Sequence, residues 1–216
     1  MSDRVRMNTV SLATTTFSQG VAMWHAGTDL LRSKSLDRNS FDSGDWFNRI
    51  DWSMQDSTFG SGLPPAGDNS AKWDFMRPLL ADPALKPGPA DISAAADRAA
   101  ELLRIQRSSP LFRLSTADQI QDRVGFPLGG PDQTPGVVVM TLDDTTGPDL
   151  DPRWERIVVI FNASDEVTTQ TLPDPTHRSF ALHPVQAGGA DAVVRSASYD
   201  DGAFTVPART VAVFVS

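Results

Sequence analysis

The chain has 216 residues, of which 40% are hydrophobic, which predicts a globular protein with one large domain or two small ones. Its formal net charge of −8 argues against a nucleic-acid partner, because such proteins displace counterions from phosphates with clustered lysines and arginines. The absence of cysteine excludes disulfides, thiolate metal sites and a cysteine nucleophile.

No apolar run approaches the ~18 to 20 residues that a membrane-spanning helix requires. The N-terminus also lacks the succession of basic, apolar and small residues that marks a secretion signal. We therefore expect neither a membrane partner nor a signal peptide. The composition selects no compartment, so the localisation is left unknown.

The first predicted elements are a helix and a short strand. Residues 5–20 place apolar side chains among small polar ones and end at Gly20, which favours a helix. Residues 21–27, VAMWHAG, form a short apolar run ended by glycine, which predicts a buried strand. From residue 28 to about 89 regular periodicity fades, and glycines and prolines interrupt the chain. Its many aromatic residues favour a long functional loop over a disordered segment.

The second half of the chain is predicted to begin with a helix and to continue as short β-strands. Residues 91–110 have an alanine-rich interior and apolar residues at helical spacing, and Pro110 ends the pattern. Short β-branched runs separated by turn residues follow, which is typical of an antiparallel sandwich. The predicted strands cover residues 136–144, 156–164, 167–173, 180–186, 192–200 and 203–216.

Four stretches of the sequence carry a resemblance to a known family. They read QGVAMWHAGTDLLRSKSLDRNSFDSGDWFNRIDW, GLPPAGDN, SSPLFRLSTADQIQDRVGFPLGGPDQTPGVVVMTLDD and FTVPARTVAVFVS. Together they closely resemble the C-terminal part of pullulanase-type debranching enzymes, including plant limit dextrinases, which are glycoside hydrolases of the α-amylase clan. The resemblance runs across essentially the whole chain.

The resemblance implies a mixed fold, in which the last elements of an incomplete (β/α)8 barrel precede an all-β antiparallel C-terminal sandwich. Residues 1–112 would then be the end of the catalytic barrel, with its helix 7, strand 8, long substrate loop and helix 8. Residues 113–216 would be the sandwich domain. The missing N-terminal part of the barrel is an expected partner.

The family hydrolyses α-1,6-glucosidic bonds in pullulan and limit dextrins with an aspartate nucleophile, a glutamate acid/base and a second aspartate. By resemblance, these three carboxylates lie on barrel strands four, five and seven, which precede everything present here. We therefore expect no catalytic residue in this chain and no activity from the chain alone. The alternative is an active site made from acidic residues of this chain. It has little support, because no two acidic residues form a recognisable paired motif in the sequence.

The run 32–48, RSKSLDRNSFDSGDWFN, follows the implied strand eight. Active sites of (β/α)8 barrels lie on the loops after the strands, so this run is expected to face the substrate cleft. Charged and amide groups can bind sugar hydroxyls, and aromatic rings can stack on the sugar ring. By resemblance, Lys34 and Asp37 are the first candidates for holding a glucose unit of a branched α-glucan. The further substrate-binding candidates are Asp45, Trp46, Asn48 and Arg32.

A structural alternative stands beside each of these roles. Arginine and aspartate in a long loop often pair to hold it in place, and Ser43, Gly44 and Asp45 suit a turn with a capping aspartate. For Lys34 and Asp37 the ligand role is preferred. For the next candidates, Asp45, Trp46 and Asn48, the structural role is preferred.

No metal or cofactor is predicted. The oxygen-rich run suggests calcium, but its spacing is not that of an EF-hand, so calcium is considered only for the parent enzyme. The histidines show no metal-ligand spacing. His25 is expected as a hydrogen-bonded core residue, and His177 and His183 as ordinary residues of the β-domain. The sequence thus predicts a C-terminal fragment of a debranching enzyme; the alternative is a non-catalytic carbohydrate-binding or scaffold protein derived from that fold.

Overall fold

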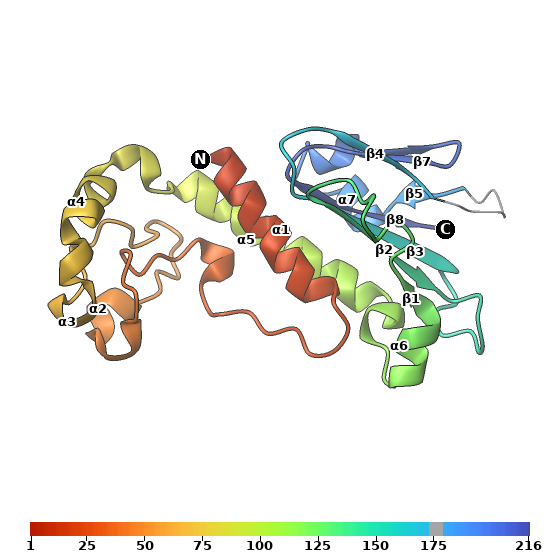
Figure 1. Cartoon of the computed structure of the whole chain (residues 1–216), viewed down its shortest axis with the longest axis horizontal. Helices are drawn as coiled ribbons and strands as arrows, with labels where there is room; N and C mark the ends of the chain where they lie inside the picture. Colours follow the sequence, from red (N-terminus) through yellow and green to blue (C-terminus); the bar gives the residue numbers. More distant parts are fainter. Residues whose placement is uncertain (173–178) are drawn as a thin grey trace. The chain divides into compact units, whose positions relative to one another are not determined.

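The computed structural model describes residues 1–172 and 179–216, shown in Figure 1. These residues divide into two compact units. Unit 1 comprises Met1–Asn8 and His25–Ala96, and unit 2 comprises Thr9–Trp24 and Asp97–Ser216. The sequence predicted a different boundary, between a barrel part that ends at residue 112 and a sandwich domain that begins at residue 113. That boundary stays a prediction.

Unit 2 contains two antiparallel sheets within the described residues, which confirms the predicted antiparallel β-structure. The large sheet has the strand order β1-β2-β3-β8-β5, and the small sheet has the order β4-β7-β6. The strands are β1 Val124–Gly125, β2 Val137–Asp143, β3 Arg156–Asn162, β4 Thr168–Thr171, β5 Ala181–Leu182, β6 Ser198–Asp200, β7 Ala203–Val206 and β8 Thr210–Val215.

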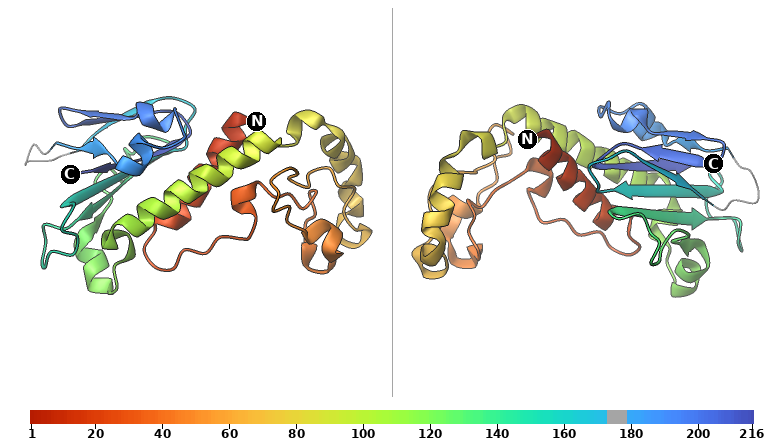
Figure 2. Two further views of the ribbon diagram at one scale, coloured as in Figure 1. Left: turned by 180° about the vertical axis from the view of Figure 1, so that it is seen from behind. Right: turned by 45° about the horizontal axis from the view of Figure 1, so that its top comes forward.

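Both faces of the large sheet are buried at its centre, since almost every residue of β3 and β8 is buried. The two strands are apolar at nearly every position, as expected for strands covered on both sides. One face, with Val159 and Val213, packs against the unit-2 parts of helices α1 (Ser2–Phe17) and α5 (Pro89–Ser108). The other face, with Val158 and Phe214, packs against the small sheet. Unit 2 therefore has three layers: helices, large sheet and small sheet (Figure 2).

Helix α5 confirms the helix predicted over residues 91–110. Its first turn contains Asp91, whose carboxylate accepts a hydrogen bond from the Gly88 amide at 3.0 Å. Its interior is rich in alanine, the residue with the highest helix propensity. The helix ends at Ser108, two residues before Pro110, since a proline disfavours helical backbone at the residue before it.

The predicted burial of residues 21–27 is wrong, and their pairing as a barrel strand stays a prediction. The described residues contain no strand in this range and close no barrel. Val21 and Met23 are 91% and 81% exposed, and His25, expected in the core, is exposed too. An extended segment becomes a strand only by pairing with a neighbour, and no described strand pairs with this one. Trp24, in contrast, packs against the apolar cluster shared by the helices and the large sheet.

Besides the N-terminal parts of α1 and α5, unit 1 is built from short helical turns joined by loops. They are η1 Thr28–Leu30, η2 Ser40–Asp42, α2 Gly44–Asn48, α3 Ala66–Asn69, η3 Ser70–Lys72, α4 Trp73–Ala81 and η4 Pro83–Leu85. The sequence did not predict α4, because Pro78 suggested an interruption there. Pro78 lies inside this helix, although proline removes one helical hydrogen bond.

Two of the predicted strands are partly helical. Residues 180–186 contain β5 followed by α7 (Pro184–Ala187), and residues 192–200 contain η6 (Val194–Ser196) followed by β6. The His183 side chain caps α7, and Pro184 occupies its first position. The other helices of unit 2 are η5 (Pro110–Arg113) and α6 (Ala117–Arg123).

Candidate functional site

The candidate loop, residues 32–48, takes its local shape from side chains that accept hydrogen bonds from backbone amides two residues ahead. The Asp37 carboxylate accepts from the amide of Asn39 at 3.2 Å, and the Asn39 side chain accepts from the amide of Phe41 at 3.4 Å. Such Asx turns stabilise tight bends outside helices and sheets. The aspartates and asparagines of this run therefore have a structural role as well as any role in binding.

Both carboxylate oxygens of Asp37 have further partners in unit 1. Oδ1 also accepts from Nδ2 of Asn69 at 2.9 Å, and Oδ2 accepts from the Ser43 hydroxyl. Burial raises the pKa of this carboxyl, but hydrogen bonds from Ser43 and Asn69 outweigh burial, and the pKa lies below its usual value. Asp37 is therefore a carboxylate at neutral pH, held in one orientation.

Arg32, Lys34 and Asn48 come together around Ser40. The Lys34 ammonium donates to the Ser40 hydroxyl, and Asn48 Nδ2 donates to the Ser40 carbonyl at 2.8 Å. The Arg32 guanidinium donates to the Asn48 carbonyl at 3.0 Å. Residues from the two ends of the candidate loop are thus linked directly, and the charges of Arg32 and Lys34 are anchored to it.

Arg32 also reaches the exposed His25 and covers Gly27. Its Nη2 lies 3.3 Å from Nδ1 of His25. Gly27 has a φ of +88°, and a Cβ there would lie 2.9 Å from Cβ of Arg32. A glycine is therefore required at residue 27 on both counts, backbone conformation and space.

Trp46 and Asp45 lie in α2 at the surface. The Trp46 side chain is 54% exposed, and its Nε1 donates to the Ser61 carbonyl at 3.0 Å. The guanidinium of Arg49 lies 4.3 Å from the centre of the Trp46 ring, a cation–π arrangement. Asp45 is exposed in the first turn of the helix. The structure thus holds Trp46 at its indole nitrogen and leaves much of its ring in solvent.

The backbone of unit 1 is strained at several non-glycine residues. Ser35 and Leu36, inside the candidate loop, have φ values of 54° and 62°, and Met54 and Thr58 have values of 59° and 62°. Ser35 is buried and its hydroxyl donates to the Gly62 carbonyl at 2.6 Å, so neighbouring contacts hold the strained conformation. Such strain is concentrated at functional sites in proteins.

Sequence reasoning missed Asn69, Ser40 and Ser43, which organise the loop. Asn69 is 1% exposed; its Nδ2 donates to Asp37 and to the Pro65 carbonyl, and its Oδ1 accepts from the Arg38 amide at 3.0 Å. Asn69 ends the stretch GLPPAGDN that carried part of the family resemblance. That stretch was the available signal for Asn69, although nothing in it indicated Asp37 as the partner.

The described residues offer no metal centre: no three His, Cys, Asp or Glu side chains lie close enough to share an ion. Two members of the oxygen-rich run, Asp37 and Asn39, form Asx turns instead. His177 lies outside the described residues. Among the helices described, none combines the length and the apolar character needed to cross a membrane.

The sequence is similar to that of known pullulanases over its whole length. The family model described as "Alpha-1,6-glucosidases, pullulanase-type, C-terminal" matches residues 54–216. Pullulanase 1, chloroplastic, from Arabidopsis thaliana is 45% identical over 222 residues, which cover 100% of this chain and 23% of that protein. A pullulanase from Klebsiella pneumoniae is 37% identical over 217 residues, which cover 99% of this chain and 20% of that protein.

Solved structures show the same similarity. The crystal structure of PulA from Klebsiella oxytoca matches with a TM-score of 0.91 and 37% identity, over 100% of this chain and 20% of that chain. The maltotriose complex of PulA from Klebsiella pneumoniae matches with a TM-score of 0.89 and 39% identity, over 98% of this chain and 23% of that chain. The chain thus spans between 20% and 23% of the length of these relatives.

Proposed function

Because the chain belongs to the pullulanase-type α-1,6-glucosidases, as part of their C-terminal region, we propose that it is the C-terminal part of a debranching hydrolase. The parent enzyme would hydrolyse α-1,6-glucosidic bonds in branched α-glucans such as pullulan and limit dextrins. The observation that carries this proposal is that the similarity covers the whole chain, the candidate loop included, rather than one motif.

Within that enzyme, the candidate loop would contribute a substrate subsite. Lys34 and Asp37 would bind hydroxyls of a glucose unit, and the exposed ring of Trp46 would offer a stacking surface. Two observations support this role: Asp37 is ionised and held in place, and the surrounding backbone is strained. A relative has been solved with maltotriose bound, which makes a linear α-glucan the first ligand to test.

Residues 21–27 would pair as a barrel strand with strands that the parent enzyme supplies from outside this chain. The pattern of exposure supports this: Val21 and Met23 project into solvent, while Trp24 packs against the helices of unit 2. An apolar, exposed segment without strand partners is the kind of surface that a neighbouring strand covers. The catalytic carboxylates would come from those missing strands, and residues 113–216 would support the barrel as a β-domain.

A chimera tests this function. The chain replaces the matching C-terminal region of Arabidopsis pullulanase 1, the 45% identical relative, and the release of reducing ends from pullulan is measured. We expect an active chimera and no activity from the 216-residue chain alone. Hydrolysis by the chain alone would contradict the assignment of the carboxylates to missing strands. A folded but inactive chimera would favour a non-catalytic carbohydrate-binding protein instead.

A further inference from the structure

The face of the large sheet that packs on the small sheet changes from apolar to polar side chains at one end of β2 and β3. Val139 and Val158 on this face are buried in the apolar cluster between the sheets. Because side chains alternate along a strand, the same face continues with Thr141 and Asp143 on β2 and with Arg156 on β3. A sandwich interior is normally apolar, so a polar end of this face calls for an explanation.

The two charged residues form a fixed pair. Asp143 and Arg156 are direct partners in the strand register, and Nη2 of Arg156 lies 3.0 Å from Oδ2 of Asp143. Asp143 Oδ1 also accepts from the amide and the hydroxyl of Thr145, at 2.8 and 2.6 Å. Both side chains of the pair remain partly accessible, with 25% of Arg156 and 29% of Asp143 exposed.

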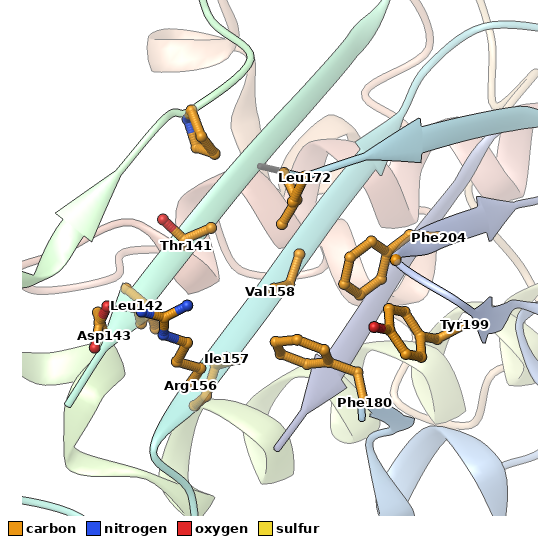
Figure 3. Close-up of a pocket in the computed structure, with 12 residues that line it drawn as sticks. Thr141, Leu142, Asp143, Arg156, Ile157, Val158, Leu172, Phe180, Tyr199 and Phe204 are labelled. Atoms are coloured by element: carbon orange, nitrogen blue, oxygen red, sulfur yellow. Dashed lines mark ion pairs between the residues drawn. The ribbon is translucent and has the colours of Figure 1, made fainter. Parts of the chain in front are cut away.

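An aromatic cluster borders this polar patch across a pocket: Phe180 and Phe204 are buried, with 8% and 1% of their surface exposed, and Tyr199 is half-buried and presents the accessible ring. The ring centres of Phe180 and Tyr199 are 5.4 Å apart, and those of Tyr199 and Phe204 are 4.8 Å apart. Figure 3 shows these three rings on one side of the pocket and Thr141, Asp143 and Arg156 on the other. The volume of this pocket is about 140 Å³.

A pocket with an ion pair on one side and aromatic rings on the other accepts only some chemical classes of ligand. A purely apolar ligand would bury the ion pair without offering it hydrogen bonds, which is costly. An anionic ligand would meet Asp143 beside Arg156 and find little net positive charge. A neutral ring with hydroxyls at its edge and C–H groups on its face satisfies both sides. Since pockets for drug-sized ligands start at ~300 Å³, this smaller pocket suits one such ring.

We propose that this pocket, formed by Thr141, Asp143, Arg156, Phe180, Tyr199 and Phe204, binds a single pyranose unit of an α-glucan, separately from the candidate loop. The one-ring, polyhydroxylated character of the ligand follows from the pocket itself. Its identity as part of an α-glucan rests on the proposed function. The site would hold a branch or chain end of the glucan on the β-sandwich.

Titration of the full 216-residue chain with maltose, followed by amide NMR spectra, tests the proposal. We expect saturable shifts of the Thr141 and Tyr199 amides, with a Kd on the order of 1 mM, as one sugar ring offers few contacts. Arg156→Gln should weaken this binding at least tenfold. Arg98→Gln is the matched control, because it removes another partly buried ion pair of unit 2, with Asp191 at 3.2 Å, and should leave the affinity unchanged.

If Arg156→Gln does not fold, Thr141→Val replaces it, since this change keeps the shape and removes a hydroxyl that donates to the Gly125 carbonyl at 3.3 Å and can accept from a sugar hydroxyl; it should weaken binding several-fold. The proposal is overturned if maltose shifts amides only in residues 32–48, if no saturable shift occurs at the pocket, or if both ion-pair variants lose affinity equally. An inactive chimera would overturn the proposed function and leave these shifts unaffected, so the two failures are distinguishable.

Discussion

Asp37 shows how a single side chain organises the candidate loop. Its carboxylate joins three parts of unit 1: the turn at Asn39, the hydroxyl of Ser43 and the buried amide of Asn69. A binding group that is already oriented loses little conformational freedom when a ligand arrives, which favours affinity. The same contacts also stabilise the loop, so a test must separate binding from loop order.

We predict that Asp37→Ala lowers kcat/KM of the chimera on pullulan by at least tenfold, because it removes a fixed ionised acceptor from the proposed subsite. Asp51→Ala is the matched control. Asp51 likewise accepts backbone hydrogen bonds, from the amides of Ser53 and Gln55, in a turn outside the candidate loop. Equal losses in the two variants, measured by initial rates, would show that Asp37 acts through loop order alone.

His183 is a second residue whose environment has a measurable consequence. It is 1% exposed, Nδ1 accepts from the Val185 amide at 3.2 Å, and Nε2 lies 3.1 Å from the Ser108 hydroxyl. Burial, with a smaller contribution from the charge of Arg153, lowers the pKa of His183 from 6.5 to about 4. Burial, which the sequence did not indicate, is what sets this histidine apart from an exposed one.

This pKa predicts an acid-sensitive fold. Between pH 6.5 and about 4 the unfolded chain binds a proton at His183 and the folded chain does not, so the free energy of unfolding falls as the pH falls. The slope contributed by one such group is ~1.4 kcal/mol per pH unit at most. NMR titration of the His183 ring should give a midpoint near 4, and denaturant unfolding should show the slope. A ring midpoint at 6.5 would refute the prediction.

At the scale of elements, residues 21–27 and β8 show that two similar apolar sequences can adopt different structures. Both are short apolar runs, but β8 pairs with β3 and β5 and is buried throughout, whereas residues 21–27 are unpaired. The backbone groups of an extended segment are satisfied by neighbouring strands, so pairing depends on which partners are available. Apolar composition alone therefore did not decide that residues 21–27 form a strand.

The contact between a loop and helix α4 provides a test at this scale. Gly60 has a φ of +75°, and a Cβ there would lie 2.7 Å from the carbonyl oxygen of Leu80 in α4. We predict that Gly60→Ala lowers the free energy of unfolding by ~2 to 4 kcal/mol, since it combines an unfavourable φ with a steric overlap on backbone.

Gly44→Ala is the control for this variant. Gly44 has nearly the same φ, +74°, but a Cβ there would meet no atom within 4 Å. It should therefore cost only the conformational part, ~1 to 2 kcal/mol. Denaturant titration of both variants measures the difference. Equal costs would mean that the overlap at Leu80 is relieved without loss of stability.

At the scale of the whole molecule, the two units differ in how much apolar surface they bury. In unit 2, two apolar clusters lie on opposite faces of the large sheet and join three layers. The buried apolar side chains of unit 1 form no comparable cluster and are few: Val5, Leu30, Phe59, Met76, Ile92 and Ala95. Loops held mainly by hydrogen bonds open more readily than layers held by apolar packing.

We therefore predict that amides of unit 1 exchange with solvent much faster than those of β3 and β8 in the chain alone. Hydrogen exchange followed by NMR or mass spectrometry measures this directly. In the active chimera, protection of residues 21–27 and of the candidate loop should rise, because strands of the parent barrel would then cover them. Equal protection of both units in the chain alone would contradict the view that unit 1 depends on missing neighbours.

The sequence by itself determined the features that depend on neighbours along the chain. It indicated α5 through alanine content and helical spacing, the strands β2, β3 and β8 through β-branched runs, and the family through stretches such as residues 32–48. Helix propensity, strand alternation and motif similarity are all local signals, so a single sequence carries them.

Only the tertiary structure decided what depends on groups far apart in the chain. The link from Asp37 to Asn69, the burial of His183 against Ser108, and the pocket between Arg156 and Tyr199 join residues that no local pattern pairs. The same holds for residues 21–27, whose apolar run looked like a buried strand but lacks a partner among the described strands. Burial, pairing and pKa are set by the neighbours that folding brings together, and these are properties of the packed chain.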